Sequence, residues 1–342
     1  SYSKNFIKRL TRSYKSITII GMGGSILGMK AIYSFLKFKI KKKFLFIDNL
    51  NLIQKKEINK KNLNLIISKS GNTLETISNA NILIKKKQKN IFLTENKNNY
   101  LRNLALKLKA DIVDHNNFIG GRFSVLSEVG MLPAELMGLN SSQFKQFNFL
   151  IKNKIFFNSL VKNVASTFVL LNQKKFNSVI INYDEKSNNL FNWYQQLVAE
   201  SLGKDSKGIL PLVSSMPKDN HSLMQLYLDG PGNSFFTFFD VDDHDNQKII
   251  NKEILTPLNY LKNKNLYQIK SAQKKATETV FRKRNIPFRS FKVLSRSEEA
   301  LGELFTFFML ETILLADFMK INPFDQPSVE LIKIETKRIL KN

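Results

Sequence analysis

The sequence contains no cysteine among its 342 residues. Disulfide bonds and thiolate metal ligands are therefore excluded, and the composition fits a reducing compartment. Histidine is nearly as scarce, since the chain has only three, and they show no metal-ligand spacing with one another. We therefore expect no metal site and a cytoplasmic location.

Long uninterrupted apolar runs are also missing. The most apolar stretch, LFTFFMLETILLADFM, is broken by Glu311 and Asp317. A membrane-spanning helix needs about 20 consecutive, predominantly apolar residues, so this stretch is expected to be a buried helix. No signal-peptide pattern opens the sequence. We expect no contact with a membrane.

Acidic residues are few, with 28 Asp and Glu against 53 Lys and Arg, and the net charge is +25. Such an excess fits either a solvated surface or a face that binds a polyanion. The lysines occur in short scattered runs such as KFKIKKK and IKKKQK, and no nucleic-acid recognition motif accompanies them. We favour the solvated surface and expect no nucleic-acid partner. The charge would add some attraction for a small dianionic substrate.

What the sequence does contain is an alternation of short β-rich runs with helical patterns. This order is typical of parallel sheets covered by helices on both faces. A first series fills residues 1–150, and a second series fills residues 151–342. We therefore predict two tandem αβα sandwiches with mainly parallel sheets, followed by C-terminal helices. The expected strands are 16–20, 44–48, 63–68, 91–95, 111–115, 177–184, 208–215, 234–242 and 288–295, and the expected helices include 125–139, 191–202, 271–285, 297–319 and 326–341.

The glycine-rich stretch GMGGSILG follows the first expected strand and opens a helix. Such loops hold anions because the first N–H groups of a helix are unpaired. A dinucleotide fingerprint would need a third glycine where Ile26 stands, although Asp48 is placed to bind a ribose. A Walker A loop would need Lys-Ser or Lys-Thr where Met29-Lys30 stands. Neither nucleotide motif is complete.

A second loop, SKSGNTLET, also joins an apolar strand to a helix. Ser68, Ser70 and Thr73 supply hydroxyl groups, and Gly71 allows close backbone approach. The simpler interpretation is that these residues only cap the helix. Together with Gly24 and Ser25 of the first loop, however, they favour a site for a compact phosphate monoester. Lys69 would contribute mainly its backbone.

Both loops are similar to those of sugar isomerase (SIS) domains, and four further segments resemble phosphoglucose isomerases. The six segments stretch from Gly21 to Lys333 in the family's order. The resemblance implies two SIS-type domains in a homodimer that interconverts glucose 6-phosphate and fructose 6-phosphate, a step of glycolysis and gluconeogenesis. It implies no metal and no nucleotide cofactor. The four further segments are GGRFSVLSEVGMLPAELMG, WYQQLVAESLGK, DNHSLMQLYLDGP and INPFDQPSVELIK.

The resemblance also implies roles for individual residues. Glu200 would move a proton between C1 and C2 through a cis-enediol, and Arg122 would face the enediolate oxygens. His221, supplied by the neighbouring subunit, and Lys333 would open the sugar ring. Gln196 would complete the sugar and phosphate contacts. The apolar neighbours of Glu200 are expected to desolvate it and so favour the protonated form; they are Leu197, Val198, Ala199 and Leu202.

The chain departs from the family pattern before Lys333, where Ser328 and Ile332 replace the usual glycines. Its short length is also similar to that of bifunctional phosphoglucose/phosphomannose isomerases, which share the architecture. A second alternative is a non-catalytic SIS protein that senses a sugar phosphate. Such a sensor would need the two loops but would have no reason to retain Glu200, His221 and Arg122.

Overall fold

The computed structural model describes residues 2–51, 61–242, 247–250 and 253–341. Its first sheet is wholly parallel, with the strand order β2-β1-β3-β4-β5. The central strands β1 and β3 are buried along nearly their whole length, and the edge strands are partly exposed. The strands are β1 (Ser16–Ile20), β2 (Lys43–Ile47), β3 (Asn62–Ile67), β4 (Lys89–Glu95) and β5 (Asp111–His115).

The second sheet is also parallel, with the order β7-β6-β8-β9. Its central strands are buried at every position but the first, as expected where helices cover both faces. The strands are β6 (Asn177–Asn182), β7 (Leu210–Ser215), β8 (Ser234–Val241) and β9 (Phe288–Val293).

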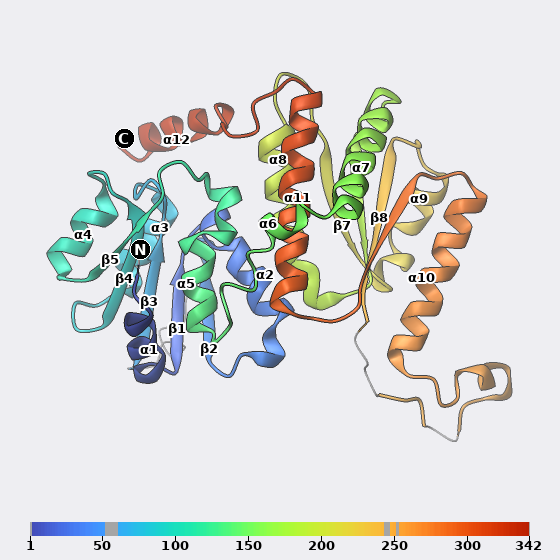
Figure 1. Ribbon diagram of the computed structural model, residues 1–342, viewed down its shortest axis with the longest axis horizontal. Helices are drawn as coiled ribbons and strands as arrows, with labels where there is room; N and C mark the ends of the chain where they lie inside the picture. The colour runs from blue at the N-terminus through green and yellow to red at the C-terminus, as the bar shows by residue number, and fades with distance from the viewer. Residues whose placement is uncertain (1, 52–60, 243–246, 251–252, 342) are drawn as a thin grey trace.

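Helices fill the space between and around the two sheets (Figure 1). In the middle, α2 packs against α8, and α11 packs against α7 and α8. One buried apolar cluster includes residues of both sheets, such as Leu65 and Phe239, so the two halves share a core. The helices are α1 (Lys4–Ser13), α2 (Leu27–Phe35), α3 (Leu74–Leu83), α4 (Tyr100–Leu108), α5 (Glu128–Leu136), α6 (Phe147–Leu150), α7 (Lys154–Asn172), α8 (Asn188–Leu202), α9 (Met224–Asp229), α10 (Leu266–Lys283), α11 (Glu298–Phe318) and α12 (Ser328–Ile339).

The predicted α/β fold with two parallel sheets is confirmed, and every expected strand is present within a few residues. The helix expected over 125–139 is interrupted: a 3₁₀ turn, η4 (Gly121–Leu126), precedes α5. Ser127 separates them because its side chain accepts a hydrogen bond from Val129 N–H as the cap of α5. The boundary near residue 150 stays a prediction, and it lies at the end of α6.

Two short polar contacts tie the end of β5 to the start of α5. The Oε1 atom of Glu128 lies 2.6 Å from His115 Nδ1 and accepts a hydrogen bond from the Asn116 backbone N–H at 2.7 Å. Burial opposes ionisation of Glu128, but these hydrogen bonds outweigh it and lower the pKa of the carboxyl group from 4.5 to about 2. His115, which matches no sequence motif, therefore has a structural partner.

A depressed carboxyl pKa predicts a loss of stability in acid. Glu128 stabilises the folded chain above its ordinary pKa, and this contribution disappears as the pH falls through the folded value of about 2. We expect Glu128→Gln to lower Tm at pH 7, and the difference from the unaltered chain to shrink steadily below pH 4.5. Calorimetry of both chains at a series of pH values from 7 downward measures this difference in Tm. A difference that stays constant down to pH 2 would contradict the assignment.

Candidate active site

The two predicted phosphate loops meet at the carboxyl edge of the first sheet. They follow β1 and β3, the adjacent strands at which the strand order reverses direction. Ligands of open α/β sheets bind at this kind of switch point. The loops touch there: a Cβ atom added at Gly21 would lie 3.1 Å from the carbonyl oxygen of Ile67, which ends β3. Topology therefore brings Ser25 to the same edge of the sheet as the loop that begins at Ser68.

In the second loop, the hydroxyl groups of Ser68 and Thr73 lie 2.9 Å apart. Thr73 occupies the cap position of α3, yet its side chain makes no capping hydrogen bond. Helix capping is therefore not the role of Thr73 in this structure. The first N–H groups of α3 are not capped by this side chain and can bind an anion.

The rest of this loop is arranged around its backbone. Gly71 has φ +64°, and a side chain there would collide with Asn99. The ammonium group of Lys69 points away to the Asn117 carbonyl oxygen at 2.8 Å and to Glu95 at 3.5 Å. Ser70 is exposed and accepts a hydrogen bond from Asn72 N–H. The expected contribution of the Lys69 backbone to phosphate binding stays a prediction.

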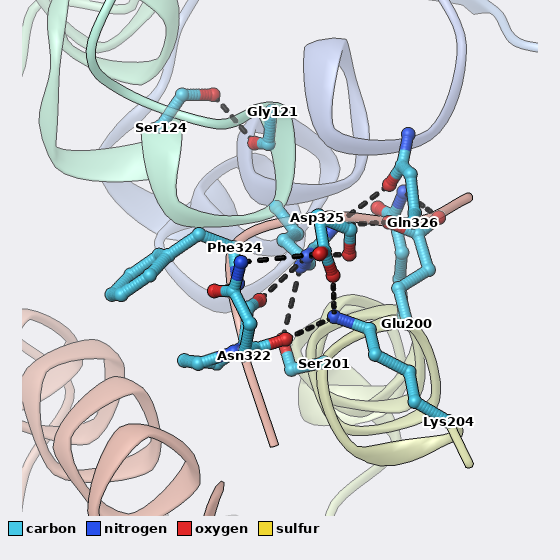
Figure 2. A network of polar contacts seen from close by, with 12 residues as sticks. Gly121, Ser124, Glu200, Ser201, Lys204, Asn322, Phe324, Asp325 and Gln326 are labelled. Atoms are coloured by element: carbon cyan, nitrogen blue, oxygen red, sulfur yellow. Dashed lines mark hydrogen bonds and ion pairs between the residues drawn. The ribbon is translucent and has the colours of Figure 1, made fainter. Parts of the chain in front are cut away.

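Gly24 allows the first loop to lie against the segment that carries Arg122. A Cβ atom on Gly24 would overlap the carbonyl group of Gly121, so only glycine lets the two loops approach. The next residue after Gly121 is Arg122, which is 4% exposed. Within the same turn, Ser124 Oγ donates to the Gly121 carbonyl oxygen at 2.7 Å, as Figure 2 shows.

The Arg122 guanidinium group is enclosed by acceptors. Its NH1 nitrogen donates to Glu200 Oε2 at 3.1 Å and to Gln326 Oε1 at 2.6 Å. Its Nε donates to Ser201 Oγ at 2.9 Å. Its NH2 nitrogen donates to two backbone carbonyl oxygens, at 2.5 and 2.8 Å, which belong to Pro323 and Asp325. A buried guanidinium held in this way is a fixed positive charge beside the candidate carboxylate.

Glu200 lies one residue before Ser201 near the end of α8, and its side chain is 29% exposed. Gln196, one turn earlier on the same helix face, donates to Glu200 Oε1 at 2.9 Å. The expectation that apolar neighbours desolvate the carboxylate is wrong. Those neighbours point elsewhere because adjacent helical positions face different directions: Leu197, Val198 and Leu202 are buried in the core and Ala199 is exposed.

His221 and Lys333 are not brought to Glu200 within the chain. α8 ends at Leu202 and β7 begins at Leu210, so the short connection keeps the Glu200 end of α8 near the start of β7. His221 is exposed on η6 (Lys218–His221), beyond the far end of β7. The length of β7 alone is about 17 Å at about 3.3 Å per residue. Lys333 is exposed on α12 and donates to Glu330 at 2.5 Å.

Three residues of this site were missed in the sequence. Gln326 contacts Arg122 directly, and Asp325 pairs with Lys204 at 2.6 Å. All three lie in quoted segments, ESLGK and FDQP, which carried the resemblance without a role for these positions. Among the residues that the structure describes, no group of three or more His, Cys, Asp or Glu could hold a metal ion.

Comparison with known proteins agrees with this geometry. The family model for phosphoglucose isomerase matches residues 3–342. The chain belongs to the phosphoglucose isomerase family. Its relatives include the glucose-6-phosphate isomerase of Methanocaldococcus jannaschii, with 32% identity over 99% of this chain and 88% of that protein. The glucose-6-phosphate isomerase of Mycoplasmopsis pulmonis is 34% identical over 98% of this chain and 85% of that protein.

The fold agrees with the family as well. The crystal structure of a glucose-6-phosphate isomerase from Chlamydia trachomatis superimposes with a TM-score of 0.81 over 98% of this chain and 72% of that chain. At 18% identity this likeness concerns the fold alone. The predicted SIS-type architecture and the resemblance to the family are therefore confirmed.

Proposed function

We propose that this chain interconverts glucose 6-phosphate and fructose 6-phosphate by ring opening and proton transfer through a cis-enediol. The observation that carries the proposal is the Glu200 carboxylate 3.1 Å from the buried Arg122, in a chain of this family whose first glycine-rich loop contacts the same helix. A proton acceptor next to a fixed cation is what aldose–ketose isomerisation requires.

The contacts suggest a separate role for each group in the site. The hydroxyl groups and backbone N–H groups of the two loops anchor the phosphate, which fixes the distance from the sugar to α8. Glu200 then takes a proton from C2 and returns it to C1, or the reverse. Negative charge that develops on the oxygens of C1 and C2 is stabilised by the guanidinium of Arg122, whose position is set before substrate arrives. Gln196 orients the carboxylate from one turn below.

Ring opening needs a further proton donor and acceptor, and we assign His221 and Lys333 to it. Glu200 lies near the start of β7, whereas His221 comes after its other end. His221 therefore serves the active site of a second copy in a homodimer. The outer side of α7 supports such a pairing, because it exposes apolar residues such as Ile155 and Val169 at 83% and 53%. This helix is long and apolar enough to cross a membrane by length and composition. We assign its exposed side to the dimer.

Lys333 depends on the position of α12. Figure 1 shows this helix, after the segment that follows α11, extending above the upper edge of the first sheet. It has no buried residue, and Ile332 is 69% exposed. We propose that α12 settles against the sugar when substrate binds, which brings Lys333 to the ring oxygen. The side chains of Ser328 and Ile332, where the family has glycine, would then be accommodated at the surface of the helix.

The first test is turnover by the unaltered chain. We expect conversion of fructose 6-phosphate to glucose 6-phosphate without any added metal or nucleotide, measured by coupling the product to a dehydrogenase. Mannose 6-phosphate is assayed in parallel, and substantial turnover of it would indicate the bifunctional alternative. Binding of the sugar phosphate without turnover would indicate the sensor instead.

We also assign the two sandwiches to residues 1–150 and 151–342 and the protein to the cytoplasm.

A further inference from the structure

The acceptors around Arg122 are of two kinds. Nε and NH2 bind groups fixed by the backbone or by a buried serine, namely Ser201 Oγ and the carbonyl oxygens of Pro323 and Asp325. NH1 donates only to the ends of two side chains, Glu200 and Gln326. Every N–H donor of the guanidinium is therefore occupied. A sugar oxygen can gain a hydrogen bond from Arg122 most readily by replacing a side chain at NH1.

The carbonyl oxygens that hold NH2 belong to a short segment, residues 322–326, which we call the C-terminal arm. It lies between α11 and α12, and most of it is exposed: the Phe324 side chain is 62% exposed. An exposed segment without regular secondary structure holds a buried arginine well only if something fixes the segment.

Lys204 provides that fixation. Its ammonium group donates to the backbone carbonyl oxygen of Asn322 and to Asp325 Oδ1, at 2.6 Å for the latter. Figure 2 shows the Lys204 side chain reaching from the end of α8 to the C-terminal arm. Asn322 donates in turn to Asp325 Oδ2 at 3.1 Å. The same hydrogen bonds lower the pKa of the Asp325 carboxyl group, so the ion pair persists in mild acid.

We infer that the Lys204–Asp325 ion pair is a positioning element for the reaction: it holds the C-terminal arm so that Nε and NH2 of Arg122 stay bound while NH1 is offered to the enediolate. Lys204 lies two residues beyond the last residue of α8, the helix that carries Glu200, so the end of one helix and the residues after it position both the base and the cation that faces it. The inference rests on the proposed function.

Loss of this pair should affect the transition state more than the bound substrate. The test variant is Asp325→Ala, which keeps the carbonyl oxygen that holds Arg122 but removes the partner of Lys204. We expect kcat to fall about tenfold, with KM changed less than about twofold, because small misplacements of a catalytic group slow the chemical step. Asp325→Glu, which retains the charge, should keep most of the activity.

A pair of inhibitors separates positioning from general damage. We expect Asp325→Ala to weaken binding of 5-phospho-D-arabinonohydroxamate, a planar mimic of the enediolate, by about tenfold. Glucitol 6-phosphate has the phosphate but no enediolate mimic, and its binding should change less than about twofold. Asp111→Ala is the matched control, because Asp111 is a partly exposed carboxylate at the start of β5 that pairs with Lys89 at 2.5 Å. This control variant should bind both inhibitors as tightly as the unaltered chain does.

Three outcomes would overturn the positioning role of the Lys204–Asp325 ion pair. If Asp325→Ala weakens the binding of both inhibitors equally, or lowers Tm strongly, the pair only supports the fold. Unchanged kcat in Asp325→Ala would overturn it as well. The unaltered chain is assayed first: if it does not isomerise fructose 6-phosphate, the proposed function fails and this inference fails with it. If it does, a negative result with Asp325→Ala concerns the positioning role alone.

Discussion

Glu200→Gln is expected to lower kcat by about a thousandfold, within the range that a single general acid–base group contributes. The amide cannot accept the C2 proton as a carboxylate does, whereas the shape of the side chain is retained. KM should change little, because the phosphate loops make the main ground-state contacts. Coupled turnover of fructose 6-phosphate measures both constants.

The variant should remain folded for a structural reason. The Gln196 side-chain oxygen is buried without a hydrogen-bond partner among the described residues. If the Gln196 amide group turns over, its oxygen can accept from the amide at position 200, whose own oxygen faces Arg122, so the number of unpaired polar atoms does not rise. Glu303→Gln, an exposed position on α11, serves as the control for loss of one carboxylate. Retained turnover in Glu200→Gln with an unchanged Tm would refute the assigned base.

Mixing two inactive variants is expected to restore activity if His221 serves a partner's site. Glu200→Gln and His221→Ala homodimers should each be nearly inactive. In a hybrid dimer, one site loses both groups and the other recovers both. With random exchange about half of the dimers are hybrids, so the mixture should approach about a quarter of normal activity.

The mixing experiment also distinguishes the two arrangements of His221. If this histidine acted within its own chain, each hybrid site would still lack one group and mixing would restore nothing. The subunits are unfolded and refolded together so that exchange is complete, and each variant refolded alone is the control. Analytical ultracentrifugation shows whether a dimer forms at all. A monomer that turns over substrate at the normal rate would exclude the shared site.

Much of the fold was predictable because strands and helices follow local patterns of side chains. The apolar run of 62–67 and the serine-rich loop after it are adjacent in sequence, so the strand and the phosphate loop could be expected together. The break between η4 and α5 was not foreseen, since a Ser cap within an apolar helical pattern has only a weak local signal.

The candidate site was predictable only in part. Glu200, Arg122 and Gln196 lie in segments that resemble the family, and the structure brings them together. The surroundings of Glu200 were misjudged because sequence neighbours were taken as spatial neighbours. The actual contacts come from Gln196, one turn away, and from Arg122, which is 78 residues distant in the chain.

The sequence by itself determined which segments become strands, where the two anion-binding loops stand and which family the chain resembles, because these depend on short-range periodicity and on motifs. The tertiary structure alone decided how Arg122 is held. Its acceptors lie up to 204 residues away, on α8 and on the C-terminal arm, and the Lys204–Asp325 pair spans 121 residues. Contacts between such distant segments arise from the packing of whole helices and sheets, and no local pattern encodes them.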